Sequence, residues 1–244
     1  MNNNIVFFSD LDDTLIQTSR KTDFSRDPII SAHNREGKPS SFMYPEIKVL
    51  LDKIISSGIM FVPTTARNID SYNRTFFAKE FTPQYAILNF GGTILKKGKI
   101  DKTWKQRMKT EYDNLNDFEQ LKSFTIKNLG SSFANLSVKM VDGFYISIHN
   151  KTFKDDEKTL TCIRKILMDV LARFQKYYLH TNGNSFAILP KFLNKRFAVE
   201  YLIEKNKPAL TLGAGDNPSD LDFMNLTNFH IVPNCSMIFH KTNN

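Results

Sequence analysis

The chain has 244 residues, of which 41% are hydrophobic and 24% are charged, and this composition excludes an intrinsically disordered protein. No apolar run is long enough for a membrane span or a signal peptide, so we expect a cytoplasmic protein with no membrane partner. The net charge of +8 suits binding of anionic small molecules. Nucleic acid is not an expected partner, because no aromatic-interleaved RNA motif and no DNA-reading helix accompanies the lysines.

Residues 5–9 form a short apolar run that is typical of a buried strand, and three aspartates follow it at positions 10, 12 and 13. Neighbouring carboxylates repel one another unless a cation lies among them. Ligands of open α/β sheets bind at the carboxyl ends of the strands. Asp10 and Asp12 are therefore candidate site residues. A capping turn before a helix is the alternative interpretation of this stretch.

Strand and helix patterns alternate over the next eighty residues. Residues 17–41 are polar and rich in turn formers, which indicates a hairpin or loop beside the aspartates. Periodic apolar residues then predict a helix over 45–56, a strand over 59–63, a helix over 68–79 and a strand over 85–89. Such β-α-β units with short loops predict a parallel sheet.

The second predicted strand leads into Thr65, Ala66 and Arg67 at the expected start of a helix. A hydroxyl group and unpaired backbone N–H groups at a helix start form a ready site for phosphate oxygens. Thr65 is therefore a candidate for phosphate binding, and a plain helix N-cap is the alternative.

The order of elements changes over residues 93–184. The expected elements are a helix, two strands and a long helix, at 117–129, 136–141, 144–149 and 155–178. The two strands meet at an Asp-Gly turn, which indicates an antiparallel hairpin and therefore an α+β insertion. Cys162 falls in the long helix and Cys235 follows a strand near the C-terminus, and both are expected to be buried thiols.

The last sixty residues return to alternating strands and helices, with a strand over 185–189, a helix over 195–205 and strands over 208–212 and 228–233. Lys195 is the first residue of the helix and could bind an anionic group. Asp216 and Asp220 follow the apolar strand and are spaced i, i+4. They would face one site if the intervening residues form a helical turn.

These four stretches, in this order, resemble the sequence motifs of the haloacid dehalogenase (HAD) superfamily of phosphohydrolases. Asp-x-Asp-x-Thr at 10–14 resembles the first motif. Thr-Ala-Arg at 65–67 resembles the Thr-Gly-Arg of members with a C2-type cap, with alanine in place of the usual glycine. Lys195 and its helix resemble the third motif, and Gly-Asp-x-x-x-Asp at 215–220 resembles the fourth.

The resemblance implies an α/β fold, with a Rossmann-like doubly wound parallel-sheet core and an inserted α+β cap of C2 type. The core would comprise residues 1–92 and 185–244, and the cap residues 93–184. The overall size of the chain, and the stretch in which a predicted strand is followed by Lys195, look most like the subgroup of sucrose-phosphate phosphatases, mannosyl-phosphoglycerate phosphatases and Cof-type phosphatases.

The resemblance also implies roles for individual residues. Asp10 would attack phosphorus, Asp12 would protonate the leaving alcohol and later activate water, and Lys195 would hold phosphoryl oxygens together with Thr65. The residues expected to bind phosphate are Thr65, Ala66, Arg67, Lys195 and Asn217. The expected Mg²⁺ ligands are Asp10, Asp12, Asp216 and Asp220, with Asp12 contributing its backbone carbonyl.

The predicted function is Mg²⁺-dependent hydrolysis of a small phosphorylated metabolite through an aspartyl-phosphate intermediate, with a sugar phosphate as the favoured substrate class. Phosphoryl transfer to another acceptor, and hydrolysis of a nucleotide or phosphoprotein, stay open because the four motifs act only on the phosphoryl group. A catalytically silent binding or regulatory protein is the alternative from another class. The identity of the substrate and the oligomeric state stay open.

Overall fold

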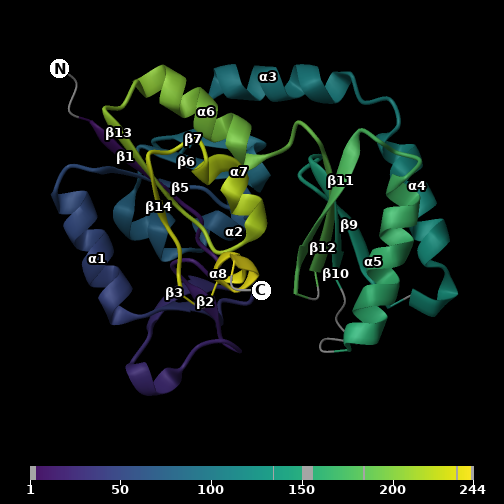
Figure 1. The fold of residues 1–244 in the computed structure, drawn as a ribbon, viewed down its shortest axis with the longest axis horizontal. Coiled ribbons are helices and arrows are strands. Elements are labelled where there is room, and N and C mark those ends of the chain that lie inside the picture. The colour runs from purple at the N-terminus through teal and green to yellow at the C-terminus, as the bar shows by residue number, and fades with distance from the viewer. Residues whose placement is uncertain (1–3, 134, 150–155, 184, 235, 243–244) are drawn as a thin grey trace. The chain divides into compact units, whose positions relative to one another are not determined.

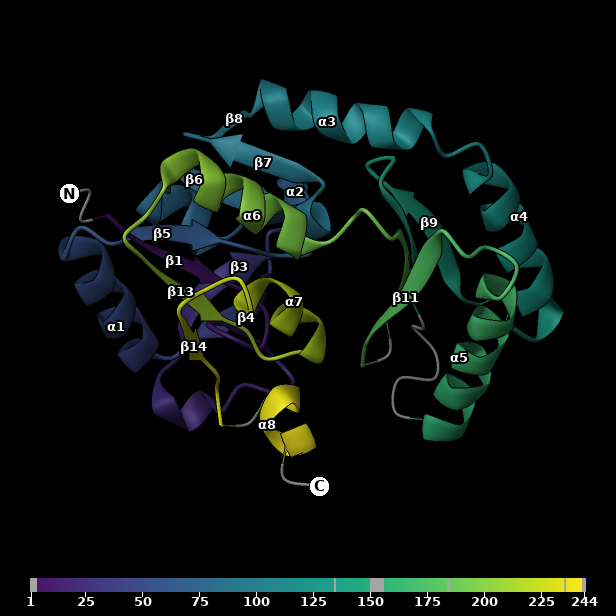
Figure 2. The same cartoon turned by 45° about the horizontal axis from the view of Figure 1, so that its top comes forward.

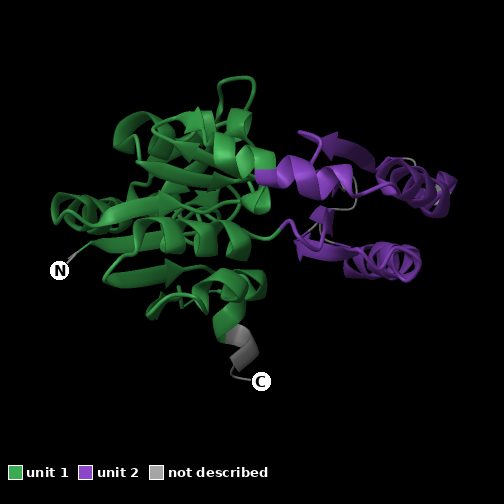
Figure 3. Cartoon of the chain, turned by 90° about the horizontal axis from the view of Figure 1, so that it is seen from above, with its two compact units in different colours: residues 1–106, 194–244 green, residues 107–193 purple. Residues whose placement is uncertain are grey.

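The chain falls into two compact units, which Figure 3 colours separately. Unit 1 comprises residues 1–106 and 194–244, and unit 2 comprises residues 107–193. The computed structural model describes residues 4–133, 135–149, 156–183, 185–234 and 236–242. Within these described ranges, no helix is both long enough and apolar enough to cross a membrane.

Unit 1 is built on a parallel sheet of four strands in the order β14-β13-β1-β5 (Figure 1). The strands are β1 (Ile5–Ser9), β5 (Met60–Pro63), β13 (Leu210–Ala214) and β14 (Phe229–Ile231). The central strand β1 is buried on both faces, as expected for an apolar run inside a parallel sheet. A single parallel bridge between Thr64, which follows β5, and Ile87 joins β6 (Tyr85–Leu88) to the β5 edge of this sheet.

Helices cover both faces of this sheet. Phe7 on one face belongs to an apolar cluster that includes Leu51 and Phe77. These two residues come from α1 (Pro45–Ser56) and from the π-helical turn η2 (Phe77–Phe81), and α2 (Ile69–Asn73) packs in the same cluster. The helices α6 (Lys195–Asn206) and α7 (Leu221–Met224) lie over the other face (Figure 2). The predicted doubly wound α/β core is confirmed.

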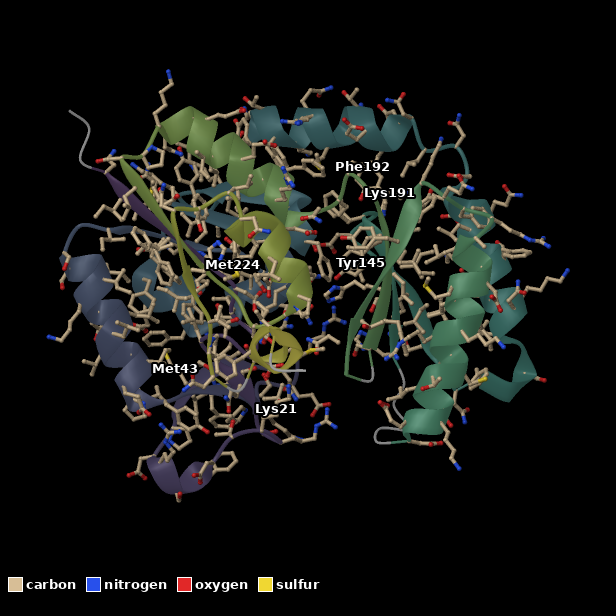
Figure 4. All side chains as sticks on the ribbon, in the orientation of Figure 1. Lys21, Met43, Tyr145, Lys191, Phe192 and Met224 are labelled. Carbon is tan, nitrogen blue, oxygen red and sulfur yellow. The ribbon has the colours of Figure 1, made fainter. Side chains whose placement is uncertain are left out.

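Two small antiparallel sheets flank the parallel one. The first contains β2 (Gln17–Thr18), β4 (Pro39–Met43) and β3 (Ile29–His33), together with the turn η1 (Phe24–Arg26), and we call residues 17–43 the flap. The second has the order β6-β7-β8, in which β7 (Thr93–Lys96) pairs with β6 and β8 (Lys99–Ile100) pairs with β7. The remaining elements are η3 (Asn89–Gly91), α3 (Lys102–Asp113), η5 (Pro218–Asp220) and α8 (Met237–Thr242). Met43 and Met224, labelled in Figure 4, are fully buried.

Unit 2 has its own α+β architecture. Its four-stranded antiparallel sheet has the order β11-β12-β10-β9. The elements are α4 (Phe118–Leu129), η4 (Ser131–Phe133), β9 (Ser137–Val141), β10 (Tyr145–His149), α5 (Glu157–Leu171), β11 (Tyr177–Asn182) and β12 (Ser185–Pro190). A separate apolar cluster, with Ile146, Ile163 and Leu167 fully buried, joins the sheet to α4 and α5. The unit is inserted between two segments of unit 1, as the sequence predicted for the α+β module.

The units divide the chain at 106/107 and 193/194, whereas the sequence analysis divided it at 92/93 and 184/185. Pairing explains both differences. Residues 93–100 form β7, which pairs with β6, and β8, which pairs with β7, so they belong to unit 1. The strand expected in the core over 185–189 is β12, which pairs with β10 and β11 in unit 2.

Two further predictions are wrong. The single helix expected over 155–178 ends at Leu171, and Tyr177–Asn182 form a strand instead, because they pair with β12 along their whole length. Cys162 is exposed on α5, since it lies beside the apolar stripe of that helix and not within it. Cys235 lies outside the described residues.

Candidate active site

Three strand ends meet at one edge of the parallel sheet. The register pairs Ser9, the last residue of β1, with Pro63 at the end of β5 and with Ala214 at the end of β13. The chain continues from these ends into Asp10 and into the loops that carry the second and fourth motifs. Segments far apart in the sequence therefore converge at the edge where open α/β sheets bind ligands.

A buried charged cluster lies at this edge. Lys195 Nζ is 2.6 Å from Asp10 Oδ1 and 2.7 Å from Asp220 Oδ1. The hydroxyl of Thr14 lies 3.3 Å from Asp10 Oδ2 and 3.1 Å from Asp216 Oδ1, so it can donate its proton to either carboxylate. All four charged side chains are less than a tenth exposed. The structure thus brings together four of the predicted site residues.

The electrostatics of the cluster reflect an excess of negative charge. Burial raises the pKa of Asp10 well above its usual value, with Lys195 acting against the shift and the neighbouring carboxylates adding to it. Burial and the Asp220 carboxylate raise the pKa of Asp216 to about 6. Burial on its own would lower the pKa of Lys195, but the two carboxylates beside it raise the value, so the ammonium stays charged.

The three aspartates of the cluster could hold a metal ion. Asp10, Asp216 and Asp220 each offer a carboxylate oxygen, and these oxygens lie within 4.8 Å of one another. Hard oxygen donors are the ligands that Mg²⁺ and Ca²⁺ prefer. A divalent cation would also offset the charge that one ammonium leaves unbalanced among three carboxylates. The donor set therefore fits the expected Mg²⁺.

The fourth motif folds as the i, i+4 spacing predicted. Residues 218–220 form the helical turn η5, and a Cβ atom on Gly215 would lie 2.4 Å from Asp220 Cβ, so glycine leaves room for that side chain. The Asn217 side chain caps the turn by accepting a hydrogen bond from Ser219 N at 3.0 Å. The Asn217 backbone donates to Asp220 Oδ2 at 3.1 Å. The predicted contact of Asn217 with phosphate stays a prediction.

The Asp12 carboxylate is not one of the three convergent carboxylates, and it pairs with Arg67. Two nitrogens of the guanidinium, Nε and Nη2, donate to the Asp12 carboxylate at 2.8 and 2.6 Å. The same guanidinium reaches Ser41 Oγ in the flap at 3.1 Å and Ser71 Oγ in α2 at 3.4 Å. Arg67 therefore joins the flap, α2 and the predicted acid–base residue, an arrangement that the motif did not reveal.

Thr65 is fully buried directly after β5. Its hydroxyl accepts a hydrogen bond from Arg67 N at 3.2 Å, and its backbone N–H donates to Ile87 O at 2.8 Å. The helix begins only at Ile69, with Asn68 as its cap, so Thr65 is not the N-cap of α2. Ala66, between Thr65 and Arg67, is partly exposed.

Sequence reasoning underestimated Thr14 and missed Ser41 and Ser71. Thr14 belongs to the Asp-x-Asp-x-Thr pattern, so its place four residues after Asp10 was a usable signal. The two serines carry no local signal, because their role depends on Arg67 from another part of the chain.

A family model described as Sucrose-6F-phosphate phosphohydrolase matches residues 3–236. The chain belongs to this family. It is a phosphatase of the HAD superfamily, as the four motifs indicated. A search of curated protein sequences found no match.

Solved structures share the fold of this phosphatase. The sucrose-phosphatase of Synechocystis sp., in complex with sucrose and phosphate, is 16% identical, with a TM-score of 0.63. The match covers 100% of this chain and 88% of that one. The C-terminal domain of trehalose-6-phosphate phosphatase from C. albicans is 14% identical, with a TM-score of 0.62 and coverage of 92% and 73%. At these identities the likeness establishes the fold alone.

Proposed function

We propose that this phosphatase hydrolyses a sugar phosphate by way of an aspartyl-phosphate on Asp10, with Mg²⁺ as cofactor. The observation that carries the proposal is the buried cluster at the end of β1, where Lys195 contacts Asp10 and Asp220 and the three aspartates converge. Buried charges of this kind are costly, and clusters of perturbed carboxylates are typical of catalytic sites.

Asp10 attacks phosphorus, a bond forms between its carboxylate oxygen and phosphorus, and the bond to the leaving alcohol breaks. Lys195 and the Thr65 hydroxyl hold the phosphoryl oxygens and stabilise the charge that develops on them. Asp12 gives its proton to the leaving alcohol, then takes a proton from the water that attacks the phosphorus of the aspartyl-phosphate. Asp10 is regenerated and inorganic phosphate leaves.

Asp10, Asp216 and Asp220 would hold the Mg²⁺, together with the backbone carbonyl of Asp12. When bound, the ion supplies positive charge that offsets the repulsion between the aspartates and an incoming phosphate. Burial and, to a smaller extent, the neighbouring carboxylates raise the pKa values of Asp10 and Asp216, and a cation among these groups would stabilise their charged forms.

The substrate class rests on the family and on its structural relatives. The Synechocystis structure holds sucrose and phosphate, and the family model describes a sucrose-6F-phosphate phosphohydrolase. We therefore propose a phosphorylated disaccharide, with sucrose 6F-phosphate as the first compound to test and trehalose 6-phosphate as the second.

We propose that unit 2 acts as the cap and recognises the sugar. Its apolar cluster occupies the face of the sheet that carries Ile146 and Ile148. Because side chains alternate along a strand, Ser147 and His149 project from the opposite face. His180 pairs across β12 with the row that contains Ser147, so hydroxyl and imidazole groups share this face. Such groups suit the hydroxyls of a sugar.

A substrate panel tests this function. Phosphate release is measured with sucrose 6F-phosphate, trehalose 6-phosphate, glucose 6-phosphate and an aryl phosphate, for the wild type and for His180→Ala. We expect one disaccharide phosphate to give the highest kcat/KM. In His180→Ala we expect a raised KM for that substrate and unchanged turnover of the aryl phosphate. Equal kcat/KM values for all four compounds would contradict a sugar-selective phosphatase.

A further inference from the structure

A buried turn with unusual backbone geometry follows β6. Asn89, Phe90 and Gly91 have φ values of 53°, 55° and 97°, so three successive residues adopt the left-handed conformation. For a residue other than glycine this conformation costs about 1–2 kcal/mol, and it persists only where the surroundings fix it. Asn89 and Phe90 are at most 8% exposed. Contacts with the surrounding residues must therefore fix this turn.

On one side the turn holds the loop of the second motif. Asn89 N donates to Arg67 O at 2.9 Å, and Phe90 N donates to Thr65 O at 3.3 Å. The backbone on both sides of Ala66 is thus tied to the turn. The position of the Thr65 hydroxyl and of the Arg67 side chain depends on these two hydrogen bonds.

On the other side the turn contacts the start of α6. A Cβ atom on Gly91 would lie 2.6 Å from Asn194 O and 3.2 Å from Lys195 Cα. Both contacts are with backbone atoms, which cannot move aside without shifting the helix start. Gly91 thus lies directly against Lys195, whose ammonium group contacts Asp10 and Asp220.

Trp104 of α3 contacts both the turn and α6. Its indole Nε1 donates to Gly91 O at 2.8 Å, and its side chain is 1% exposed. The indole ring also packs on Tyr201 of α6, with ring centroids 5.1 Å apart. Trp104 N donates to Asp101 Oδ1, and Asp101 Oδ2 pairs with Lys205, also in α6. Trp104 therefore touches both the turn and the helix that begins at Lys195.

We propose that Trp104 and Gly91 are positioning residues of the active site. The indole hydrogen bond fixes the position of the Gly91 carbonyl. The turn thereby fixes the backbone of Thr65 on one side. On the other side, the contact of Gly91 with the start of α6 fixes the position of Lys195. This inference rests on the proposed function, in which Thr65 and Lys195 hold the transferring phosphoryl group. Neither positioning residue touches the substrate.

The sharpest test changes a single atom of the indole. Trp104 is the only tryptophan of the chain, so biosynthetic replacement of tryptophan alters this position alone. β-(3-Benzothienyl)alanine replaces the N–H by sulfur with nearly the same shape, and 4-fluorotryptophan keeps the N–H as a matched control. Gly91→Ala tests the contact with Lys195 directly. Asn206→Ala is the structural control, because it removes a hydrogen bond from Asn206 Nδ2 to Leu202 O at the other end of the same helix.

Two readouts are followed. The first is kcat and KM for an aryl phosphate. We expect kcat to fall about tenfold with benzothienylalanine and about a hundredfold in Gly91→Ala, because misplacement of about 1 Å costs up to that much, whereas KM stays within about twofold. The second is the ¹⁵N signal of the Lys195 ammonium, assigned with Lys195→Arg. We expect it to shift in both altered proteins and to stay unchanged with 4-fluorotryptophan and in Asn206→Ala.

Wild-type kcat and an unshifted Lys195 signal in the benzothienylalanine protein would overturn the inference. So would an equal loss of kcat in Asn206→Ala, which would indicate a general effect of helix packing. If Gly91→Ala does not fold, the benzothienylalanine protein decides alone. A wild type that hydrolyses no phosphate ester would contradict the proposed function, and the Lys195 signal would still report whether Trp104 positions that side chain.

Discussion

The charged residues of the cluster are placed where charge is least stable. Asp10, Asp220 and Lys195 are buried in unit 1, and each carboxylate or ammonium there gives up its hydration. The short contacts to Lys195 offset part of that cost, and the raised pKa values of Asp10 and Asp216 show that the compensation is incomplete. The arrangement is better explained by catalysis than by stability.

Arg67 offers a prediction about the role of Asp12. The sequence analysis assigned Arg67 to phosphate binding, whereas the structure pairs its Nε and Nη2 with the Asp12 carboxylate. If Arg67 orients the general acid, Arg67→Met lowers kcat for a sugar phosphate by about a hundredfold, within the range of acid–base catalysis. An aryl phosphate with a good leaving group needs little protonation, so its kcat falls much less.

Steady-state kinetics with both substrates check this prediction. Arg74→Met serves as the control, because Arg74 at the C-terminal end of α2 pairs with the exposed Asp70 and donates to His33 O in the flap, away from Asp12. If Arg67 instead holds phosphate, both substrates lose activity equally in Arg67→Met, and the orienting role is then refuted.

Among the secondary-structure elements, short-range sequence patterns predicted those strands and turns whose conformation depends on neighbouring residues. The strand before Asp10 and the helical turn before Asp220 follow from apolar runs and from spacing, and both were predicted. The strand at Tyr177–Asn182 was not, because its two tyrosines and one leucine are compatible with a helix and with a strand, and pairing with β12 decides between them. The turn at Asn89–Gly91 has no sequence signal beyond two glycines, since contacts with distant residues fix it.

The link between α3 and α6 leads to a prediction about pH. Burial acts to raise the pKa of Asp101, but hydrogen bonds from Lys205 and from Trp104 N hold that pKa below its usual value. A carboxylate with a lowered pKa in the folded state contributes stability above its unfolded pKa near 4, and this contribution is lost as pH falls. We expect Asp101→Asn to cost about 1 kcal/mol at pH 7 and less at pH 3.

Urea denaturation of the wild type and of Asp101→Asn at pH 7, 5, 4 and 3 measures the difference in the free energy of unfolding. A difference that stays constant over this range would show that the Asp101 charge contributes nothing to stability.

At the scale of the whole molecule, each unit has a hydrophobic core of its own. The cluster around Ile163 and Leu167 lies wholly in unit 2, and the cluster around Phe7 and Leu51 lies wholly in unit 1. Loss of packing in one unit should therefore act first on that unit.

Truncation of one core residue in each unit tests this independence. Leu167 and Leu51 are both fully buried, and replacement of either by alanine should cost about 2–5 kcal/mol. In Leu167→Ala we expect faster amide hydrogen exchange in the helices and strands of unit 2 and unchanged exchange in β1, β5 and β13. Leu51→Ala should give the reverse pattern. Uniform acceleration in both units would mean that the chain unfolds as one cooperative body.

Metal-dependent phosphoryl transfer to Asp10 is tested by the rates of one nucleophile variant. Initial rates of phosphate release from sucrose 6F-phosphate are compared for the wild type, Asp10→Asn and Asp13→Asn, each with Mg²⁺ and with a chelator. Asp13→Asn is the matched control, because it removes a carboxylate three residues away that pairs with the exposed Lys21.

We predict turnover by the wild type and by Asp13→Asn with Mg²⁺ only, and at least a thousandfold loss in Asp10→Asn under all conditions, as expected when a nucleophile is removed. Undiminished turnover in Asp10→Asn, or full wild-type activity in the chelator, would contradict the account.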